Sequence, residues 1–376
     1  MARIVHLSSA HPRFDTRIFV KQCRSLARHG HEVSLVVADG LGDACRDGIR
    51  IVDVGRPCGR RERMLLATRR VGRAALALDA EVYQLHDPEL IPVGLRLVLG
   101  GRTVVFDAHE DVPNQLLDKP YLSPGSARLL SRAYGMLEGR ALRRFDGVLA
   151  ATPTIRDRLA AHNALVVDVN NYPRAEEFMG PAFDAPVRDS FCYVGSISAI
   201  RGVRELVQAC ALLRSPARLA LAGSFAEAEL EAEVRRHPGW RRVDALGHLD
   251  RDGIAGVMGR AFAGLVTLLP TASYRDALPV KMFEYMAAGI PVIASDFPLW
   301  RDIVEGSRCG LCVDPRDPAA IAAAIDHLAS HPREACAMGA NGRRAVLARY
   351  NWENEEAKLI AFYADLLSPH PRRKTV

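Results

Sequence analysis

The residues best suited to chemistry lie between positions 274 and 296, where a predicted helix carries a lysine and a glutamate. Pro279 suits a first helical turn, because the N–H that proline lacks would have no partner there. Lys281 lies in that turn, where unpaired N–H groups and the positive end of the helix dipole favour a phosphate. Glu284 stands eight residues after Asp276, forming an acid-x7-acid pair. The alternative is an amphipathic helix with a solvated glutamate and a lysine whose stem packs on apolar neighbours.

The whole stretch, YRDALPVKMFEYMAAGIPVIASD, resembles the signature of family 4 of the retaining GT-B glycosyltransferases, also called glycosyltransferase group 1. The usual pattern there is Glu-x7-Glu running into a helix that reads EAMAAG-P-V. The resemblance implies that Glu284 holds the ribose of a nucleotide-sugar donor and that Asp276 meets hydroxyls of the donor sugar. Asp276 departs from the family's usual glutamate and is one methylene shorter.

The loop after a predicted strand at 191–194 offers positive charge for a donor diphosphate. The family often shows Gly-Arg…Lys-Gly here, with both cations on the diphosphate. This chain has Arg201 before Gly202 at the lysine position and Ser196 where arginine is common, so Lys281 is the candidate for the second cation. Such fixed charges would stabilise the leaving diphosphate. The other donor-binding candidates implied by the resemblance are Gly195, Gly223, Leu249 in a loop like the one that covers the nucleobase, Leu278 and Pro279.

Two histidine-containing loops in the first half, HDPE at 86–89 and DAHE at 107–110, follow predicted strands. Both resemble the corresponding strand ends of family 4 enzymes, which implies that His109 approaches the reacting sugar. The alternative is a hydrogen-bonded histidine with a structural role. The candidate catalytic residues are therefore His109, Asp276, Arg201 and Lys281.

The loop after the first strand faces the expected ligand crevice, because ligands bind at the carboxyl ends of strands in parallel sheets. Many family 4 enzymes carry a glycine-rich loop here, whereas this chain has His11, Arg13 and Asp15 as candidates for contact with acceptor or diphosphate. The alternative is that Asp15 caps a helix and its neighbours are solvated. His86 and Glu110 complete the predicted acceptor-side set.

Strand-like and helical segments alternate along the chain, which is typical of parallel α/β sheets. A helix is predicted over 15–29. The resemblance implies the GT-B fold, an α/β architecture of two facing, doubly wound Rossmann-like domains with an interdomain cleft. We expect an acceptor-binding domain at 1–172, a linker at 173–189, a donor-binding domain at 190–350 and a helix within 351–376 that crosses back to the first domain. Strands are predicted at 2–8, 31–37, 49–54, 81–86, 103–107, 148–151, 165–169, 191–194, 218–222, 264–269, 292–294 and 310–313.

The composition fits a soluble chain of two ordinary domains: 376 residues, 49% hydrophobic and 25% charged. The sequence has no run of 18 apolar residues and its first residues lack a signal-peptide core, so we expect a cytoplasmic protein. The C-x-x-C pair formed by Cys309 and Cys312 lies in a strand-like apolar run and favours core packing over zinc or redox chemistry.

The positive charge is uneven. Residues 1–170 hold 25 Lys and Arg against 19 Asp and Glu, a net +6, whereas the rest hold 25 of each. Two helical stretches there, 56–73 and 128–144, combine arginines with leucines and methionines. They fit either ordinary solvated helix faces or a surface that lies on the anionic inner face of the cell membrane.

The resemblance implies transfer of a sugar from a nucleotide-diphosphate sugar to a sugar or lipid-linked acceptor, with retained configuration, in glycan, polysaccharide or glycolipid biosynthesis. We expect front-face attack and no cofactor or required metal. A nucleotide-sugar 2-epimerase of the same fold is the alternative. Nucleic-acid binding is disfavoured because the basic runs lack interleaved aromatics. The Gly40–Gly42 pair is no nicotinamide fingerprint, since the third glycine position is Cys45 and no clear helix opens there.

Overall fold

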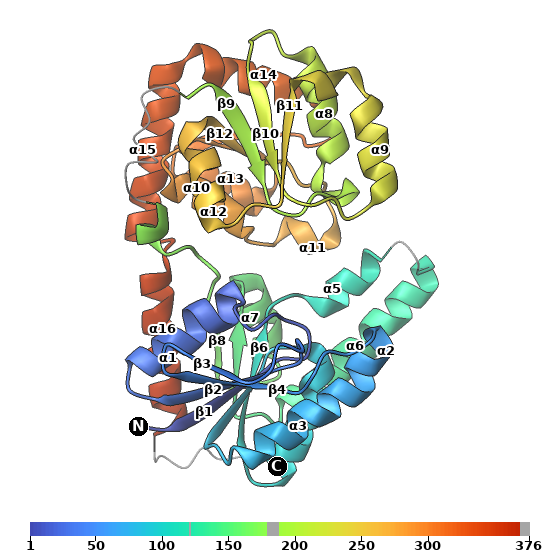
Figure 1. Cartoon of the computed structure of the whole chain (residues 1–376), viewed down its shortest axis with the longest axis vertical. Coiled ribbons are helices and arrows are strands. Elements are labelled where there is room, and N and C mark those ends of the chain that lie inside the picture. Colours follow the sequence, from blue (N-terminus) through green and yellow to red (C-terminus); the bar gives the residue numbers. More distant parts are fainter. Residues whose placement is uncertain (120–121, 179–187, 369–376) are drawn as a thin grey trace. The chain divides into compact units, whose positions relative to one another are not determined.

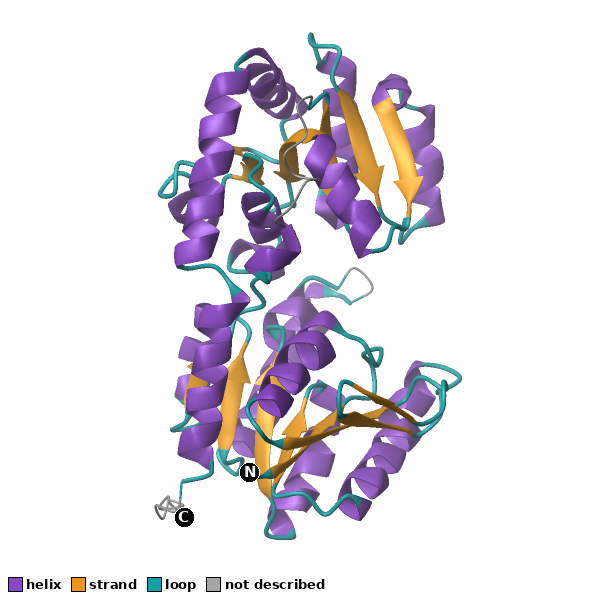
Figure 2. Ribbon diagram, turned by 60° about the vertical axis from the view of Figure 1, so that its left-hand side comes forward, coloured by secondary structure: helices purple, strands orange, loops and turns teal. Residues whose placement is uncertain are grey.

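The computed structural model describes residues 1–119, 122–178 and 188–368, which form two compact α/β units. Unit 1 comprises Met1–Asn171 together with the chain from Glu353 on, and unit 2 comprises Tyr172–Trp352. In each unit helices cover both faces of one sheet (Figures 1 and 2). This doubly wound, parallel-sheet α/β architecture is the predicted fold class.

Unit 1 is built on an eight-stranded sheet in the order β3-β4-β2-β1-β5-β6-β7-β8. All its pairings are parallel except that of β3 with β4 at the edge. The central strands are buried on both faces, which explains their continuous apolar runs. The strands are β1 (Arg3–Leu7), β2 (Glu32–Val37), β3 (Ala44–Arg46), β4 (Ile49–Asp53), β5 (Val82–Leu85), β6 (Thr103–Ala108), β7 (Gly147–Ala150) and β8 (Val166–Asp168).

The helices of unit 1 bury apolar faces against this sheet, in a core that includes Leu7, Tyr83, Leu85, Phe106 and Leu142. The segments are η1 (Thr16–Cys23), α1 (Arg24–Arg28), α2 (Arg60–Glu62), η2 (Arg63–Ala67), α3 (Thr68–Ala77), η3 (Pro88–Leu90), α4 (Ile91–Leu99), α5 (Val112–Leu117), α6 (Pro124–Leu142), α7 (Pro153–Ala160) and α16 (Trp352–Leu366).

Unit 2 is built on a six-stranded parallel sheet in the order β11-β10-β9-β12-β13-β14. Apolar cores lie on its two faces. The strands are β9 (Ser190–Val194), β10 (Arg218–Ala222), β11 (Val243–Gly247), β12 (Ala261–Val266), β13 (Val292–Ser295) and β14 (Gly310–Val313). The helices are η4 (Ala175–Phe178), η6 (Ala199–Arg201), α8 (Val203–Leu212), α9 (Ala228–Arg236), η7 (Pro238–Arg242), α10 (Arg251–Arg260), α11 (Ala272–Arg275), α12 (Val280–Ala287), α13 (Pro298–Val304), α14 (Pro318–Ser330) and α15 (Pro332–Ala348).

Three local differences from the sequence predictions have physical reasons. The helix expected over 15–29 begins as a π-helix, η1, and becomes an α-helix, α1, only at Arg24. β12 starts at Ala261 rather than Gly264, and Leu269 instead lies in a loop, where its N–H donates to Ile200 O. Two strands, β3 and β11, were not predicted; both lie at sheet edges and contain exposed residues, so they lack the buried apolar run. Of the expected linker, residues 179–187 lie outside the described residues.

Candidate active site

In the sheet of unit 2 the strand order reverses between β9 and β12, because successive strands are added first on one side of β9 and then on the other. Parallel sheets bind ligands at such topological switch points. The loops at this point pack backbone on backbone. A Cβ on Gly223, whose φ is +151°, would lie 1.9 Å from Gly195 O, and one on Gly202 would lie 2.1 Å from Thr267 O. Only glycine permits these approaches. Two of the predicted donor loops, those of Gly195–Gly202 and of Gly223, are thereby brought together with the end of β12 at one edge of the sheet.

Lys281 reaches this switch point from the first turn of α12, which Pro279 precedes as the N-cap. Its Nζ is buried and has no hydrogen-bond partner among the described residues. The ammonium lies 3.6 Å from the ring centroid of Tyr193 and 3.5 Å from where a Cβ on Gly195 would stand. Burial, and then the charge of Arg201, lower the pKa of Lys281 well below its usual value. The structure therefore places beside the glycine loop a buried amine whose charged form a bound anion would favour.

Arg201 and Glu284 lie at the same edge, with partners of their own. Arg201 Nη1 donates to Ser196 O at 3.2 Å. Glu284 Oε1 accepts from Arg251 Nη1 at 2.7 Å, and Arg251 also pairs with Glu177. The sequence pattern missed Arg251, because its partner is 33 residues away. A carboxylate that receives a charge-assisted hydrogen bond is held in a fixed orientation, as a ribose-binding group requires.

The other predicted donor residues are scattered over the same unit. Asp276 is exposed and follows α11 as its C-cap, whereas Leu278 and Leu249 are partly buried and pack on the core. Nothing among the described contacts brings Asp276 to Glu284, so its contact with a donor sugar stays a prediction.

In the sheet of unit 1 the strand order reverses between β1 and β5, and the predicted site histidines, His11, His86 and His109, lie close together there. His11 Nδ1 lies 2.8 Å from Asp87 Oδ1. Asp87 also accepts from Ser8 Oγ at 2.9 Å and from the N–H of Ser9 at 2.5 Å. Burial opposes a charge on His11, but the hydrogen bond and charge of Asp87 outweigh it and raise the pKa of His11.

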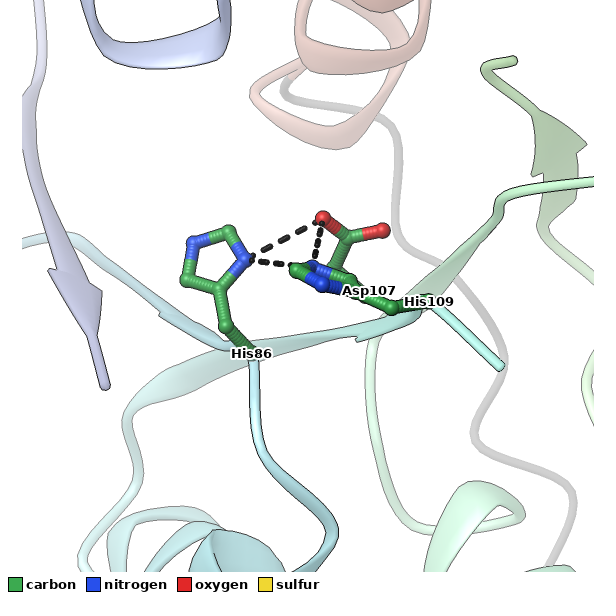
Figure 3. Close-up of side chains that lie close together, drawn as sticks. All are labelled: His86, Asp107 and His109. Atoms are coloured by element: carbon green, nitrogen blue, oxygen red, sulfur yellow. Dashed lines mark hydrogen bonds and ion pairs between the residues drawn. The ribbon is translucent and has the colours of Figure 1, made fainter. Parts of the chain in front are cut away.

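A second cluster centres on Asp107, at the end of β6 (Figure 3). His109 Nε2 lies 2.9 Å and His86 Nδ1 3.1 Å from the same Asp107 oxygen, and the two ring nitrogens are 3.1 Å apart. Arg17 binds both oxygens, at 2.6 and 3.2 Å, and Gln22 donates at 2.7 Å. Burial alone would raise the pKa of Asp107, but Arg17 holds it well below its usual range.

Arg13 and Asp15 have partners within the fold rather than a place in this cluster. Arg13 is buried and binds Asp39 twice, at 2.7 and 2.6 Å. Asp15 caps η1 by accepting from the N–H groups of Arg17 and Ile18, which is the alternative interpretation given above. Glu110 is exposed and pairs with Gln115. Direct contact of these residues with an acceptor stays a prediction.

Among the described residues two side-chain sets have the spacing to hold a metal ion: His86, Asp107 and His109, and the more exposed His327, His331 and Glu334. In the first set the guanidinium of Arg17 already neutralises the Asp107 carboxylate. A dication there would lie close to that guanidinium, so the donor set fits a hydrogen-bonded cluster better than a metal centre.

A cavity of about 610 Å³ adjoins both histidine clusters. Its polar lining includes His11, Asp87, Asp107, His109 and Glu110. Apolar and basic side chains also line it: Arg63, Met64 and Leu65 of η2, Leu116 of α5, Leu137 of α6, Arg60 of α2 and Lys119 after α5. Polar, basic and apolar side chains therefore all line this cavity.

Unit 1 is expected to lose stability as the pH falls below about 6.5. His6 and His86 are buried, and burial lowers the pKa of both. The unfolded chain therefore binds protons that the folded chain excludes, which costs up to about 1.4 kcal/mol per pH unit for each histidine. The raised pKa of His11 opposes this in part.

Hydrogen exchange in β1 and β5 at pH 7.5 and 5.5 measures this effect. Protection should fall at the lower pH. Strands β9 and β12 provide the internal control, because the buried histidines of the described chain lie in unit 1. Equal protection of β1 at both pH values would contradict the assignment of His6 and His86 as neutral.

Comparison with known proteins bears on both units. Residues 188–331 match the family model described as glycosyl transferases group 1, and residues 16–170 match the glycosyl transferase 4-like domain. The D-rhamnosyltransferase WbpZ of Pseudomonas aeruginosa is 26% identical over 294 residues, covering 73% of this chain and 70% of that protein.

Two further comparisons are informative. A GDP-mannose-dependent alpha-(1-6)-phosphatidylinositol monomannoside mannosyltransferase of Mycobacterium tuberculosis is 37% identical over 87 residues, 23% of each chain. The structure of sucrose-phosphate synthase from Thermosynechococcus elongatus superposes with a TM-score of 0.79 at 21% identity, covering 97% of this chain and 99% of that one. At 21% identity, the similarity to sucrose-phosphate synthase shows the fold alone.

Proposed function

Because this chain belongs to the group 1 glycosyl transferases and has the GT-B fold, we propose that it transfers a sugar from a nucleotide-diphosphate sugar to an acceptor in glycan biosynthesis. Unit 2 holds the donor and unit 1 the acceptor. The named relatives are transferases, and none of these comparisons favours an epimerase. The mannosyltransferase of Mycobacterium tuberculosis depends on GDP-mannose by its name, which supports a nucleotide-sugar donor here.

The observation that carries the donor proposal is the buried ammonium of Lys281. A buried amine without a hydrogen-bond partner is costly, so its retention beside Gly195 is best explained by an anionic ligand, which would also favour its charged form. Arg201 and the first-turn N–H groups of α12 add further positive potential. Together they would neutralise the diphosphate as it leaves, which is the main chemical requirement of the transfer.

We propose that the transfer retains the configuration of the anomeric carbon and that the acceptor attacks from the front face. In that reaction the acceptor oxygen bonds to the anomeric carbon as the bond from this carbon to the diphosphate breaks, and the proton of the acceptor hydroxyl passes to the departing diphosphate oxygen on the same face. Glu284 holds the ribose and Asp276 the sugar hydroxyls, while Arg201 and Lys281 carry the charge that a metal ion supplies in other phosphate sites. A thermal-shift panel of nucleotides and nucleotide sugars tests donor binding, because a cognate ligand stabilises the folded chain by mass action. No shift with any of them would contradict the donor proposal.

The acceptor side of the proposal rests on the surface around the unit 1 cavity. Leu65 on η2 is 62% exposed and Leu129 on α6 is 70% exposed. Exposed arginines accompany these apolar side chains: Arg128, Arg132 and Arg140 on α6, and Arg61 on α2, which directly precedes η2. This combination fits an anionic lipid surface and an acceptor with a lipid tail. Among the described residues, every helix is too short or too polar to cross a bilayer.

Vesicle co-sedimentation is expected to show binding that rises with anionic lipid content and falls with salt. Each basic residue near the surface contributes up to about 1 kcal/mol within a Debye length. Leu65→Ser and Arg61→Glu should each weaken binding, whereas Arg333→Glu, an exposed arginine of unit 2, should not. Equal binding to neutral and anionic vesicles at low salt would contradict membrane contact and point to a soluble acceptor.

A further inference from the structure

Asp107 dictates where protons lie on the histidine rings around it. Its carboxylate is buried and ionised, because Arg17 binds both oxygens. An ionised carboxylate can only accept hydrogen bonds. The two ring nitrogens that face its Oδ2, His109 Nε2 at 2.9 Å and His86 Nδ1 at 3.1 Å, must therefore both carry hydrogen (Figure 3).

The same logic fixes a buried hydrogen-bond chain that also ends on Asp107 Oδ2. Gln22 donates to the carboxylate at 2.7 Å, so its amide oxygen is left to accept from Gln84 Nε2 at 2.5 Å. The oxygen of Gln84 then accepts from the hydroxyl of Tyr363 on α16. All four side chains are buried. Every bond of this chain runs toward Asp107, which prevents the carboxylate from turning away.

The second nitrogen of His86 completes the assignment. Because Nδ1 of His86 carries hydrogen, its Nε2 accepts from His6 Nδ1 at 2.8 Å in the neutral ring. His6 Nε2 is buried without a hydrogen-bond partner, and in this arrangement it is a bare lone pair. The opposite arrangement would bury an orphaned N–H, which folded proteins tolerate less often than an orphaned acceptor.

We infer that Asp107 fixes neutral His109 as the Nε2–H tautomer, so that Nδ1 offers a lone pair to a hydroxyl of the bound sugar or acceptor. His109 lines the unit 1 cavity with its side chain 14% exposed, and its described polar contacts, with Asp107 Oδ2 and His86 Nδ1, both use Nε2. Asp107, Arg17 and Gln22 are positioning residues that act through His109. The inference rests on the proposed function for the identity of that hydroxyl, but not for the tautomer.

Nitrogen-15 NMR of the ligand-free 376-residue chain, recorded over a series of pH values, tests the tautomer directly. The expected spectrum shows a protonated Nε2 and a bare Nδ1 for His109, with the opposite pattern, a protonated Nδ1, for His86. A neutral His109 protonated on Nδ1 would overturn the inference. This measurement requires no variant and no activity.

Two isosteric variants test which nitrogen the ligand uses. His109→Asn can place an amide oxygen at the Nδ1 position, whereas His109→Gln keeps a donor near Nε2 but removes the Nδ1 acceptor. We expect kcat to fall by roughly a further tenfold in His109→Gln relative to His109→Asn, the usual effect of one lost hydrogen bond. The reverse order, or equal activities, would overturn the inference.

The failures of the two proposals are distinguishable. If no nucleotide sugar supports transfer, the proposed function fails, and the NMR spectrum still decides the tautomer. Asp107→Asn adds a spectroscopic check: the amide would present N–H to His109 and invert its tautomer. Should that variant not fold, because Arg17 loses its counter-ion, the wild-type spectrum and the His109 pair remain sufficient.

Discussion

Lys281→Met is expected to make ligand-free unit 2 more stable and the enzyme far less active. The ammonium is buried without a hydrogen-bond partner, so removing it relieves a cost of about 1–3 kcal/mol, offset in part by the lost contact with the Tyr193 ring. Methionine keeps the apolar length of the side chain. Loss of a fixed cation on the leaving diphosphate should reduce kcat/KM by about 2–4 kcal/mol, roughly 30- to 1,000-fold.

Lys358→Met is the matched control for Lys281→Met. Lys358 pairs with Glu355 at 2.9 Å and with Asp168 at 3.2 Å in unit 1, so its removal should destabilise that unit and leave nucleoside-diphosphate affinity unchanged. Chemical denaturation and nucleotide titration measure both variants. If Lys281→Met lowers the stability of unit 2 and retains full turnover, Lys281 is a structural residue and its assignment to the diphosphate is wrong.

Glu284→Gln should give the second-largest effect, a fall in kcat/KM of about 3 kcal/mol, near a hundredfold. The side chain keeps its size but loses the charge that strengthens hydrogen bonds to the ribose hydroxyls. Arg251, which holds Glu284 at 2.7 Å, still has Glu177 as a partner, so the fold should remain intact. Activity within about twofold of wild type would contradict the ribose assignment.

Asp276→Asn should distinguish binding of the transferred sugar from binding of the nucleotide. Asp276 is exposed and is proposed to bind only the transferred sugar. Its change should lower turnover while leaving the affinity for the free nucleoside diphosphate unchanged, whereas Glu284→Gln should weaken that affinity. Isothermal titration of both variants with the nucleoside diphosphate therefore distinguishes the two carboxylates.

Much of the fold follows from local pattern. The buried strands of both sheets carry continuous apolar runs, and glycine and proline mark the ends of many helices between them. The donor-side motif could be located because α12 and its proline, lysine and glutamate are contiguous in the chain. Gly195, Gly202 and Gly223 also came from sequence, although the steric reason for each appears only when the backbone approaches are known.

The rest depends on contacts between distant residues. Arg17 and Asp107 are 90 positions apart, and Tyr363 and Gln84 are 279 apart, so no motif reveals their pairing. Arg13 was predicted to contact a ligand because the sequence does not show its partner within the fold. That partner, Asp39, is 26 positions away, after the end of the neighbouring strand β2. The edge strand β11 was not predicted because most of its residues are not buried, so it lacks the continuous apolar run by which the other strands were recognised.

The proposed function is best tested by hydrolysis of a panel of nucleotide sugars by the purified chain, with water as acceptor. We expect that one donor class releases nucleoside diphosphate, that Lys281→Met suppresses the release, and that proton NMR detects the freed sugar first with the anomeric configuration of the donor. Release of the inverted anomer would contradict retention. A chain that binds and cleaves no nucleotide sugar in the panel would contradict the proposed function itself.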